Sequence, residues 1–217
     1  LEAATYAVTY NNQAEKRGTF SFCMCPGGVI VNAASQVGGT LVNGMSYSTR
    51  DGRFSNSAIV VGIKEHEFGE DIFSGMYFQE KLEKKAYDMI GSYGALYQNV
   101  WDFLSHKKTK HEIETSYQMK KTSCQMEKLF PEVITENLRS ALSYWKRNEE
   151  FISKNVNLIA PETRTSAPIK ILRDVKGESL NVRGLYPIGE GAGYAGGITS
   201  AAVDGMKIVD CAFTRVL

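Results

Sequence analysis

Residues 19–33 read Thr-Phe-Ser-Phe-Cys-Met-Cys-Pro-Gly-Gly-Val-Ile-Val-Asn-Ala. Two short runs of β-branched and aromatic side chains lie on either side of a Pro-Gly-Gly turn, which is typical of consecutive β-strands. The same alternation continues through residues 1–64 and predicts five strands, mostly as an antiparallel meander. The expected strands are Thr5–Tyr10, Thr19–Met24, Val29–Ala33, Thr40–Met45 and Ala58–Lys64. Asn11-Asn12 with Arg17-Gly18, and Gly38-Gly39, suit the hairpin turns between them.

Beyond residue 64 the apolar spacing becomes helical. Amphipathic helices are predicted near residues 72–90 and 131–150, the second beginning at Pro131, and an apolar helix ends the chain. Strand-like runs return at Val156–Ile159, Ile169–Leu172 and Gly184–Ile188. We therefore expect an α+β fold: a mixed, mainly antiparallel sheet from residues 4–64 and 156–172, covered by amphipathic helices, with a C-terminal strand and helix.

Composition excludes several classes of function. With 25 basic and 24 acidic residues the net charge is +1, so the chain has no overall field for nucleic acid or an anionic membrane. The lysine-rich stretch 105–129 is expected to be a polar, exposed connection; an anion-binding or RNA-binding patch there is the alternative, although Tyr117 is its single aromatic residue. Neither a signal peptide nor a transmembrane run is present, and four dispersed cysteines favour reduced thiols, which predicts a cytoplasmic protein. Because residue 1 is Leu, we expect the chain to be a piece of a longer protein.

The segment Leu185–Ala202 carries the clearest chemical signal. A strand-like run enters a cluster of glycines and then a helix, so backbone N–H groups and a helix dipole can approach a ligand closely. Glu190 can accept hydrogen bonds from sugar or ribityl hydroxyls. Gly191–Gly196 matches G-x-G-x-x-G, but only about 20 residues follow, too few to complete a dinucleotide-binding βαβ unit. A flexible loop entering a helix is the alternative interpretation.

The ending of the chain resembles the C-terminal flavin segment of FAD-dependent dehydrogenase-like proteins, and several blocks resemble one bacterial family of them, the NAD(FAD)-utilising dehydrogenases. The blocks are Phe20–Gly28, Asn43–Ser48, Asn56–Ala58, Glu162–Pro168, Gly189–Ile198 and Ala201–Gly205. The resemblance covers essentially the whole chain. It implies FAD as cofactor, a small-molecule substrate, and an FAD-closing role for Gly189, Glu190, Gly191, Gly196, Gly197 and Ile198.

One departure limits this resemblance. The family begins with a βαβ unit whose glycine turn holds the FAD pyrophosphate, and residues 1–60 contain nothing of that form. The resemblance therefore implies a substrate-side or cap domain over residues 1–175, followed by the last segment of an FAD-binding domain over 180–217. We expect FAD to belong to the parent protein and to bind this chain alone weakly or not at all.

The catalytic residues are unknown from the sequence, and three candidates stand out. Cys23 and Cys25, expected on the same face of a strand, are either small buried thiols or a redox pair facing the flavin. Metal binding is not expected, because His66, His106 and His111 show no ligand spacing to them. Arg164 is either paired with Glu162 at the surface or able to stabilise negative charge on a reduced flavin.

Two polar segments are candidates for the substrate side. The first follows a strand and is either a cavity lining or a turn with an Arg–Asp pair; it contains Asn43, Ser46, Tyr47, Arg50 and Asp51. The second contains Thr165 and Ser166 beside Arg164. The leading interpretation is a fragment of a flavin-dependent oxidoreductase, and the alternative is a non-catalytic ligand- or partner-binding module.

Overall fold

The computed structural model describes residues 8–147 and 152–213 and confirms the α+β class. The strands are β1 Thr9–Asn12, β2 Arg17–Cys25, β3 Gly28–Asn32, β4 Val42–Ser46, β5 Asn56–Val61, β6 Ala95–Asn99, β7 Lys121–Ser123 and β8 Asn157–Ala160. The helices are α1 Ser74–Ile90, α2 Val100–Leu104, α3 Glu132–Trp145 and α4 Ile198–Phe213, with short 3-10 turns η1 Glu65–Glu67 and η2 Met126–Lys128.

Internal contacts divide the chain into two compact units. The first unit comprises residues 1–64 and 80–163, and the second comprises residues 65–79 and 164–217. All the described strands belong to the first unit, and α4 belongs to the second. The candidate residues are therefore also distributed over two separate bodies.

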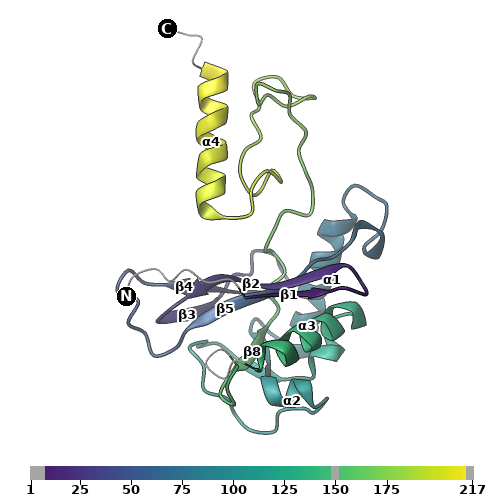
Figure 1. The fold of residues 1–217 in the computed structure, drawn as a ribbon, viewed down its shortest axis with the longest axis vertical. Coiled ribbons are helices and arrows are strands. Elements are labelled where there is room, and N and C mark those ends of the chain that lie inside the picture. Colours follow the sequence, from purple (N-terminus) through teal and green to yellow (C-terminus); the bar gives the residue numbers. More distant parts are fainter. Residues whose placement is uncertain (1–7, 148–151, 214–217) are drawn as a thin grey trace. The chain divides into compact units, whose positions relative to one another are not determined.

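The strands of the first unit form three small sheets (Figure 1). β1, β2 and β5 are antiparallel in the order β1-β2-β5, and β3 and β4 form a separate hairpin. Each strand predicted within residues 8–64 overlaps an observed strand, although residues 5–7 of the first prediction lie outside the described residues. The meander is wrong, because β5 follows the β3-β4 hairpin in the sequence but pairs with β2. The first hairpin also turns at residues 13–16, so Asn12 and Arg17 are paired strand residues rather than turn residues.

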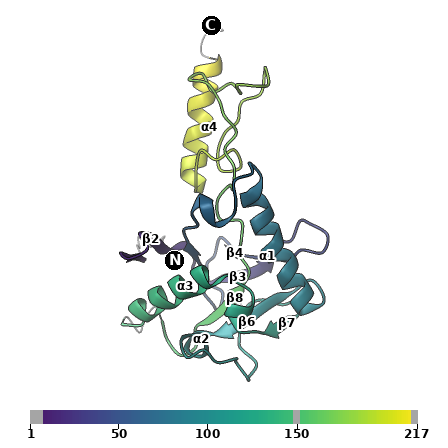
Figure 2. The same ribbon diagram turned by 90° about the vertical axis from the view of Figure 1, so that its right-hand side faces the viewer.

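The third sheet has the order β7-β6-β8, with β6 parallel to β7 and antiparallel to β8 (Figure 2). The return strand near residue 156 is confirmed, although it pairs with β6 and does not extend the N-terminal sheet as expected. β6 was not predicted, because it ends in Gln98 and Asn99. Both are buried and hydrogen-bonded: Gln98 donates to Lys107 O and accepts from Met126 N–H, and Asn99 accepts from Trp101 N–H at the start of α2.

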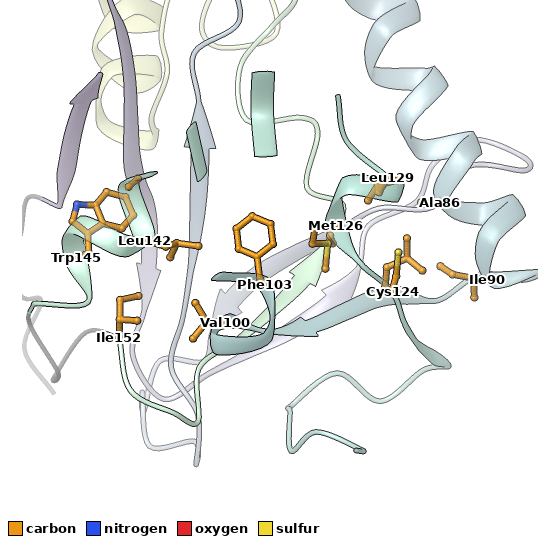
Figure 3. Close-up of a cluster of buried hydrophobic side chains, with 13 residues drawn as sticks. Ala86, Ile90, Val100, Phe103, Cys124, Met126, Leu129, Leu142, Trp145 and Ile152 are labelled. Atoms are coloured by element: carbon orange, nitrogen blue, oxygen red, sulfur yellow. The ribbon is translucent and has the colours of Figure 1, made fainter. Parts of the chain in front are cut away.

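The main core lies around α3, which packs against β1, β2 and β5 and also contacts α2. α3 begins after Pro131, one residue later than predicted. Figure 3 shows Phe103, Leu142 and Trp145 in this cluster, together with Met126 and Leu129 from the η2 region. Each large apolar side chain buried there contributes about 1.5–3 kcal/mol relative to exposure. The apolar face predicted for α3 is the face that packs into the core of the first unit.

Three local predictions are corrected by the structure. The stretch 105–129 is not simply an exposed connection, because it includes β7 and η2 and buries Ile113, Tyr117 and Met126. Residues 169–172 and 184–188 are not strands; the described backbone there forms turns and one isolated bridge between Arg173 and Ser179. The glycine cluster therefore follows irregular chain, while the expected C-terminal helix is present as α4.

Candidate functional site

The thiol loop, residues 23–28, lies at the end of β2 in the first unit. The pairing of β2 with β5 shifts register between Phe22 and Cys25, and Cys23 adopts a positive φ of 49°. Such a bulge interrupts the alternation of side chains along a strand, so the expectation that Cys23 and Cys25 share one face because of that alternation does not hold. Cys23 is exposed, and the half-buried Cys25 thiol donates to the Cys23 carbonyl at 3.5 Å.

The thiol loop is packed against the chain that follows β4. A Cβ atom on Gly27 would lie 2.2 Å from Arg50 O, and Gly27 itself has φ 54°, so only glycine fits there. Gly52 N–H donates to Gly27 O at 3.1 Å, and the Ser46 hydroxyl donates to Pro26 O at 3.0 Å. The structure thus brings together two of the predicted candidate segments, the cysteine loop and the polar loop around Arg50.

A third block of the sequence joins this cluster through Asn56. The Asn56 amide donates to Val29 O at 3.3 Å, and its Oδ1 atom lies 1.9 Å from where a Cβ on Gly44 would be. Gly44 must therefore lack a side chain so that Asn56 can join β5 to the β3-β4 hairpin. The glycines of this cluster allow close backbone packing. Sequence inspection alone explained the Pro-Gly-Gly glycines only as turn residues.

The remaining substrate-side candidates of the first unit lie at its surface. Asn43 and Tyr47 are exposed, Ser46 and Arg50 are half-buried, and Asp51 accepts a 2.6 Å hydrogen bond from Thr49. An exposed tyrosine is suited to contacting a ligand, because it combines an apolar ring with a polar hydroxyl group.

Sequence inspection missed the carboxyl group of Glu83 and considered that of Glu162 only as a possible partner of Arg164. Glu83 of α1 is only 1% exposed, and its carboxylate accepts a 2.5 Å hydrogen bond from the Thr163 hydroxyl. Burial raises the pKa of the neighbouring Glu162 to about 7. Glu162 can therefore exchange a proton near neutral pH. In the sequence, Glu162 was noted as a member of the Glu162–Pro168 block and as a possible partner of Arg164, and neither observation predicted its burial.

In the second unit, residues 189–194 form a closed turn, called the glycine turn below. Tyr194 N–H donates to Gly189 O at 3.0 Å, and Gly193 N–H donates to Glu190 O at 2.9 Å. Gly189 and Gly193 have φ values of 71° and 82°, which favour glycine. A Cβ on Gly193 would also lie 2.6 Å from Ile169 O, so the turn packs closely on the preceding chain.

Several polar groups of the glycine turn and of the approach to α4 are not used by the fold. Within the described chain, the N–H groups of Gly191, Gly196 and Gly197 have no hydrogen-bond acceptor, and the Glu190 carboxylate has no partner. No atom lies within 4 Å of where a Cβ would project at Gly191 or Gly196. These positions leave space and donors for a ligand that approaches the backbone.

An ion pair anchors the glycine turn to α4. Asp204 accepts from Gly189 N–H at 2.9 Å and from Arg173 at 2.6 and 2.9 Å. The hydrogen bonding from Arg173, and then that from Gly189, lowers the pKa of Asp204 to about 2. This carboxylate therefore stays ionised at neutral pH. Sequence analysis missed Arg173, because its partner lies on a helix 31 residues away.

The segment that carries Arg164, Thr165 and Ser166 lies along the beginning of α1 in the second unit. Ser166 O accepts from the Gln79 amide at 3.5 Å, and Pro168 packs over Gly75. Arg164 and Ser166 are exposed, and Thr165 is half-buried. The chain then continues directly to Ile169, whose carbonyl lies beside the glycine turn.

Residues 8–147 and 152–213 contain no group of three or more His, Cys, Asp or Glu side chains that could hold a metal ion. None of their helices has the length and apolar character needed to cross a membrane. None of the four cysteines is in a disulfide, and Cys124 is the buried one.

Comparison with known proteins identifies the class. Residues 1–165 match the family described as "FAD-dependent protein, C-terminal domain-like", and the chain belongs to this family. A protein of Clostridium beijerinckii named "Uncharacterized protein" is 42% identical over 215 residues. The match covers 97% of this chain and 40% of that relative, so the chain spans less than half of the relative's length.

Proposed function

We propose that this chain is the substrate-side part of a longer FAD-dependent oxidoreductase, called the parent protein below. In this proposal residues 1–175 form the substrate-side domain and residues 180–217 supply the last segment of the FAD-binding domain. Two findings support it. The chain belongs to an FAD-dependent family, and it spans only 40% of the length of the Clostridium relative.

The glycine turn carries the proposal. The unused N–H group of Gly191 and the unpartnered Glu190 carboxylate in this turn, with the N–H groups of Gly196 and Gly197 before α4, have the chemistry needed to bind the carbonyl and hydroxyl groups of FAD. Gly189, Glu190 and Gly191 would contact the cofactor from the turn, and Gly196, Gly197 and Ile198 from the start of α4. FAD, when bound, supplies an acceptor for hydride from an organic substrate or from a nicotinamide cofactor.

The exposed surface of α4 supports its assignment to an FAD-binding domain completed by other parts of the parent. Ile198, Met206 and Val209 are 88%, 68% and 53% exposed and follow a helical stripe that also includes Ala202. A contiguous apolar stripe of this kind is typical of a surface that is covered in the whole protein. On its other face, α4 buries Ile208.

The remaining candidate residues are given roles that require the parent protein to bind FAD. Arg164 would stabilise negative charge that develops on the flavin, and Cys23 with Cys25 are the candidate thiols of the first unit. Asn43, Ser46, Tyr47 and Arg50 of the first unit would hydrogen-bond the substrate, and Thr165 and Ser166 are separate candidates of the second unit for a polar contact. The packing of the Arg50 loop on the thiol loop favours joint use of these two segments.

The absorption spectrum of the purified parent tests the function. The visible bands of an oxidised flavin are expected, and a colourless parent that takes up no FAD would favour a non-catalytic binding module instead.

Two kinds of variant test the assigned groups. Glu190→Gln should weaken FAD binding by about 10–100-fold, since a hydrogen bond to a charged group contributes about 1.5–3 kcal/mol. Glu70→Gln, at an exposed carboxylate of the same unit, is the matched control. Gly191→Ala should leave the melting temperature unchanged, because space is open there, and still weaken FAD binding. Full flavin occupancy in both Glu190→Gln and Gly191→Ala would remove the assigned roles.

A further inference from the structure

The Arg173–Asp204 ion pair is bonded through both oxygens of the carboxylate. Arg173 Nη2 lies 2.6 Å from Asp204 Oδ1, and Nη1 lies 2.9 Å from Oδ2, which makes the contact bidentate. Both side chains are mostly buried, at 12% and 15% exposure. Two parallel bonds from a planar guanidinium fix orientation as well as distance.

Each partner of this pair holds one end of the glycine turn. Asp204 accepts from Gly189 N–H at 2.9 Å, at the first residue of the turn. The Arg173 guanidinium lies over the ring of Tyr194, the last residue of the turn, with its central carbon 3.5 Å from the ring centroid. Arg173 also donates to Pro187 O at 2.7 Å, just before the turn.

Glu190 and Gly191 lie between these two fixed ends. Their side-chain carboxylate and backbone N–H are the groups that the fold leaves unused. A turn held at both ends loses less conformational freedom when a ligand binds, so more of the contact energy appears as affinity. The Arg173 charge also neutralises Asp204, which would otherwise repel the phosphates of an anionic cofactor.

We propose that Arg173 and Asp204 are positioning residues, which hold the glycine turn in the conformation that binds FAD without contacting FAD themselves. This inference rests on the proposed function, because that function assigns FAD to the turn. It makes two claims that can be measured separately: the pair orders the turn in this chain, and the ordered turn raises FAD affinity in the parent.

The first measurement is backbone amide hydrogen exchange by NMR in the 217-residue chain. Arg173→Lys keeps the charge but cannot form two parallel bonds to Asp204. We expect the Gly189 and Tyr194 amides to exchange at least about ten-fold faster in this variant, as the turn opens more often. Arg183→Lys, at an exposed arginine of the same unit, is the matched control and should leave both rates unchanged. Unchanged exchange in Arg173→Lys would overturn the proposal.

The second measurement is the FAD dissociation constant of the parent, with visible circular dichroism of the bound flavin. Arg173→Lys and Asp204→Asn should each raise the dissociation constant by about ten-fold and alter the dichroism, whereas Arg183→Lys should do neither. Asp204→Glu retains a carboxylate and should restore part of the affinity. Faster exchange with unaltered FAD binding would overturn the positioning role and leave the proposed function intact. A wild-type parent that binds no FAD would overturn both.

Discussion

Replacing Gly27 by Ala tests whether the thiol loop is fixed by backbone packing. A Cβ at Gly27 would lie 2.2 Å from Arg50 O and 2.3 Å from Arg50 C, whereas favourable contacts between non-bonded atoms are about 3.5–4.0 Å. Both neighbours are backbone atoms, so a whole loop has to move. Overpacking of this kind costs about 1–3 kcal/mol, and the positive φ of Gly27 adds about 1–2 kcal/mol for a residue with a side chain.

Gly38→Ala is the matched control for the conformational part of this loss. Gly38 has φ 73° and no atom within 4 Å of the added Cβ, so only the cost of about 1–2 kcal/mol for the left-handed conformation applies. Gly27→Ala should therefore be less stable than Gly38→Ala by about 1–3 kcal/mol, because the steric term is present only at Gly27.

Thermal unfolding followed by tryptophan fluorescence measures this difference. The two tryptophans of the chain, Trp101 and Trp145, both belong to the core of the first unit or pack against it. At about 2–4 °C per kcal/mol, the melting temperature of Gly27→Ala should be about 2–12 °C below that of Gly38→Ala. Equal melting temperatures would refute the close packing of the thiol loop on the Arg50 loop.

Three further predictions concern titration, thiols and the cofactor. Because burial raises the pKa of Glu162 to about 7, above its unfolded value of 4.5, the first unit should lose stability as pH rises from about 4.5 through 7; Glu162→Gln should flatten this dependence, measured as melting temperature against pH. Iodoacetamide should modify the exposed Cys23 and Cys211 before Cys124, because burial raises the pKa of the Cys124 thiol; mass spectrometry of peptides measures the order. Elemental analysis should find no stoichiometric zinc or iron. Calorimetric titration of the 217-residue chain with FAD should give an affinity weaker than about micromolar, because the chain shows no glycine turn of the pyrophosphate-binding type in residues 1–60; a sub-micromolar affinity would contradict this.

The positions of many elements could be predicted because their signals are local. Val29–Ala33 and Ala58–Lys64 contain β-branched runs between turn residues, and the apolar face of α3 repeats with helical spacing. β6 escaped prediction, since its Gln98 and Asn99 look like loop residues until partners from residues 107, 126 and 157 satisfy them. Polar side chains can occupy a buried strand only when distant segments supply their hydrogen bonds.

The candidate site divides in the same way. The sequence by itself determined the α+β class, the glycine cluster before the last helix and the blocks that mark an FAD-dependent family. Only the tertiary structure decided that β5 pairs with β2, that a bulge interrupts the strand at Cys23, and that Asp204 bonds both Arg173 and the start of the glycine turn. Periodicity and turn chemistry act between near neighbours, whereas strand pairing and buried ion pairs depend on which remote residues the folded chain brings within bonding distance.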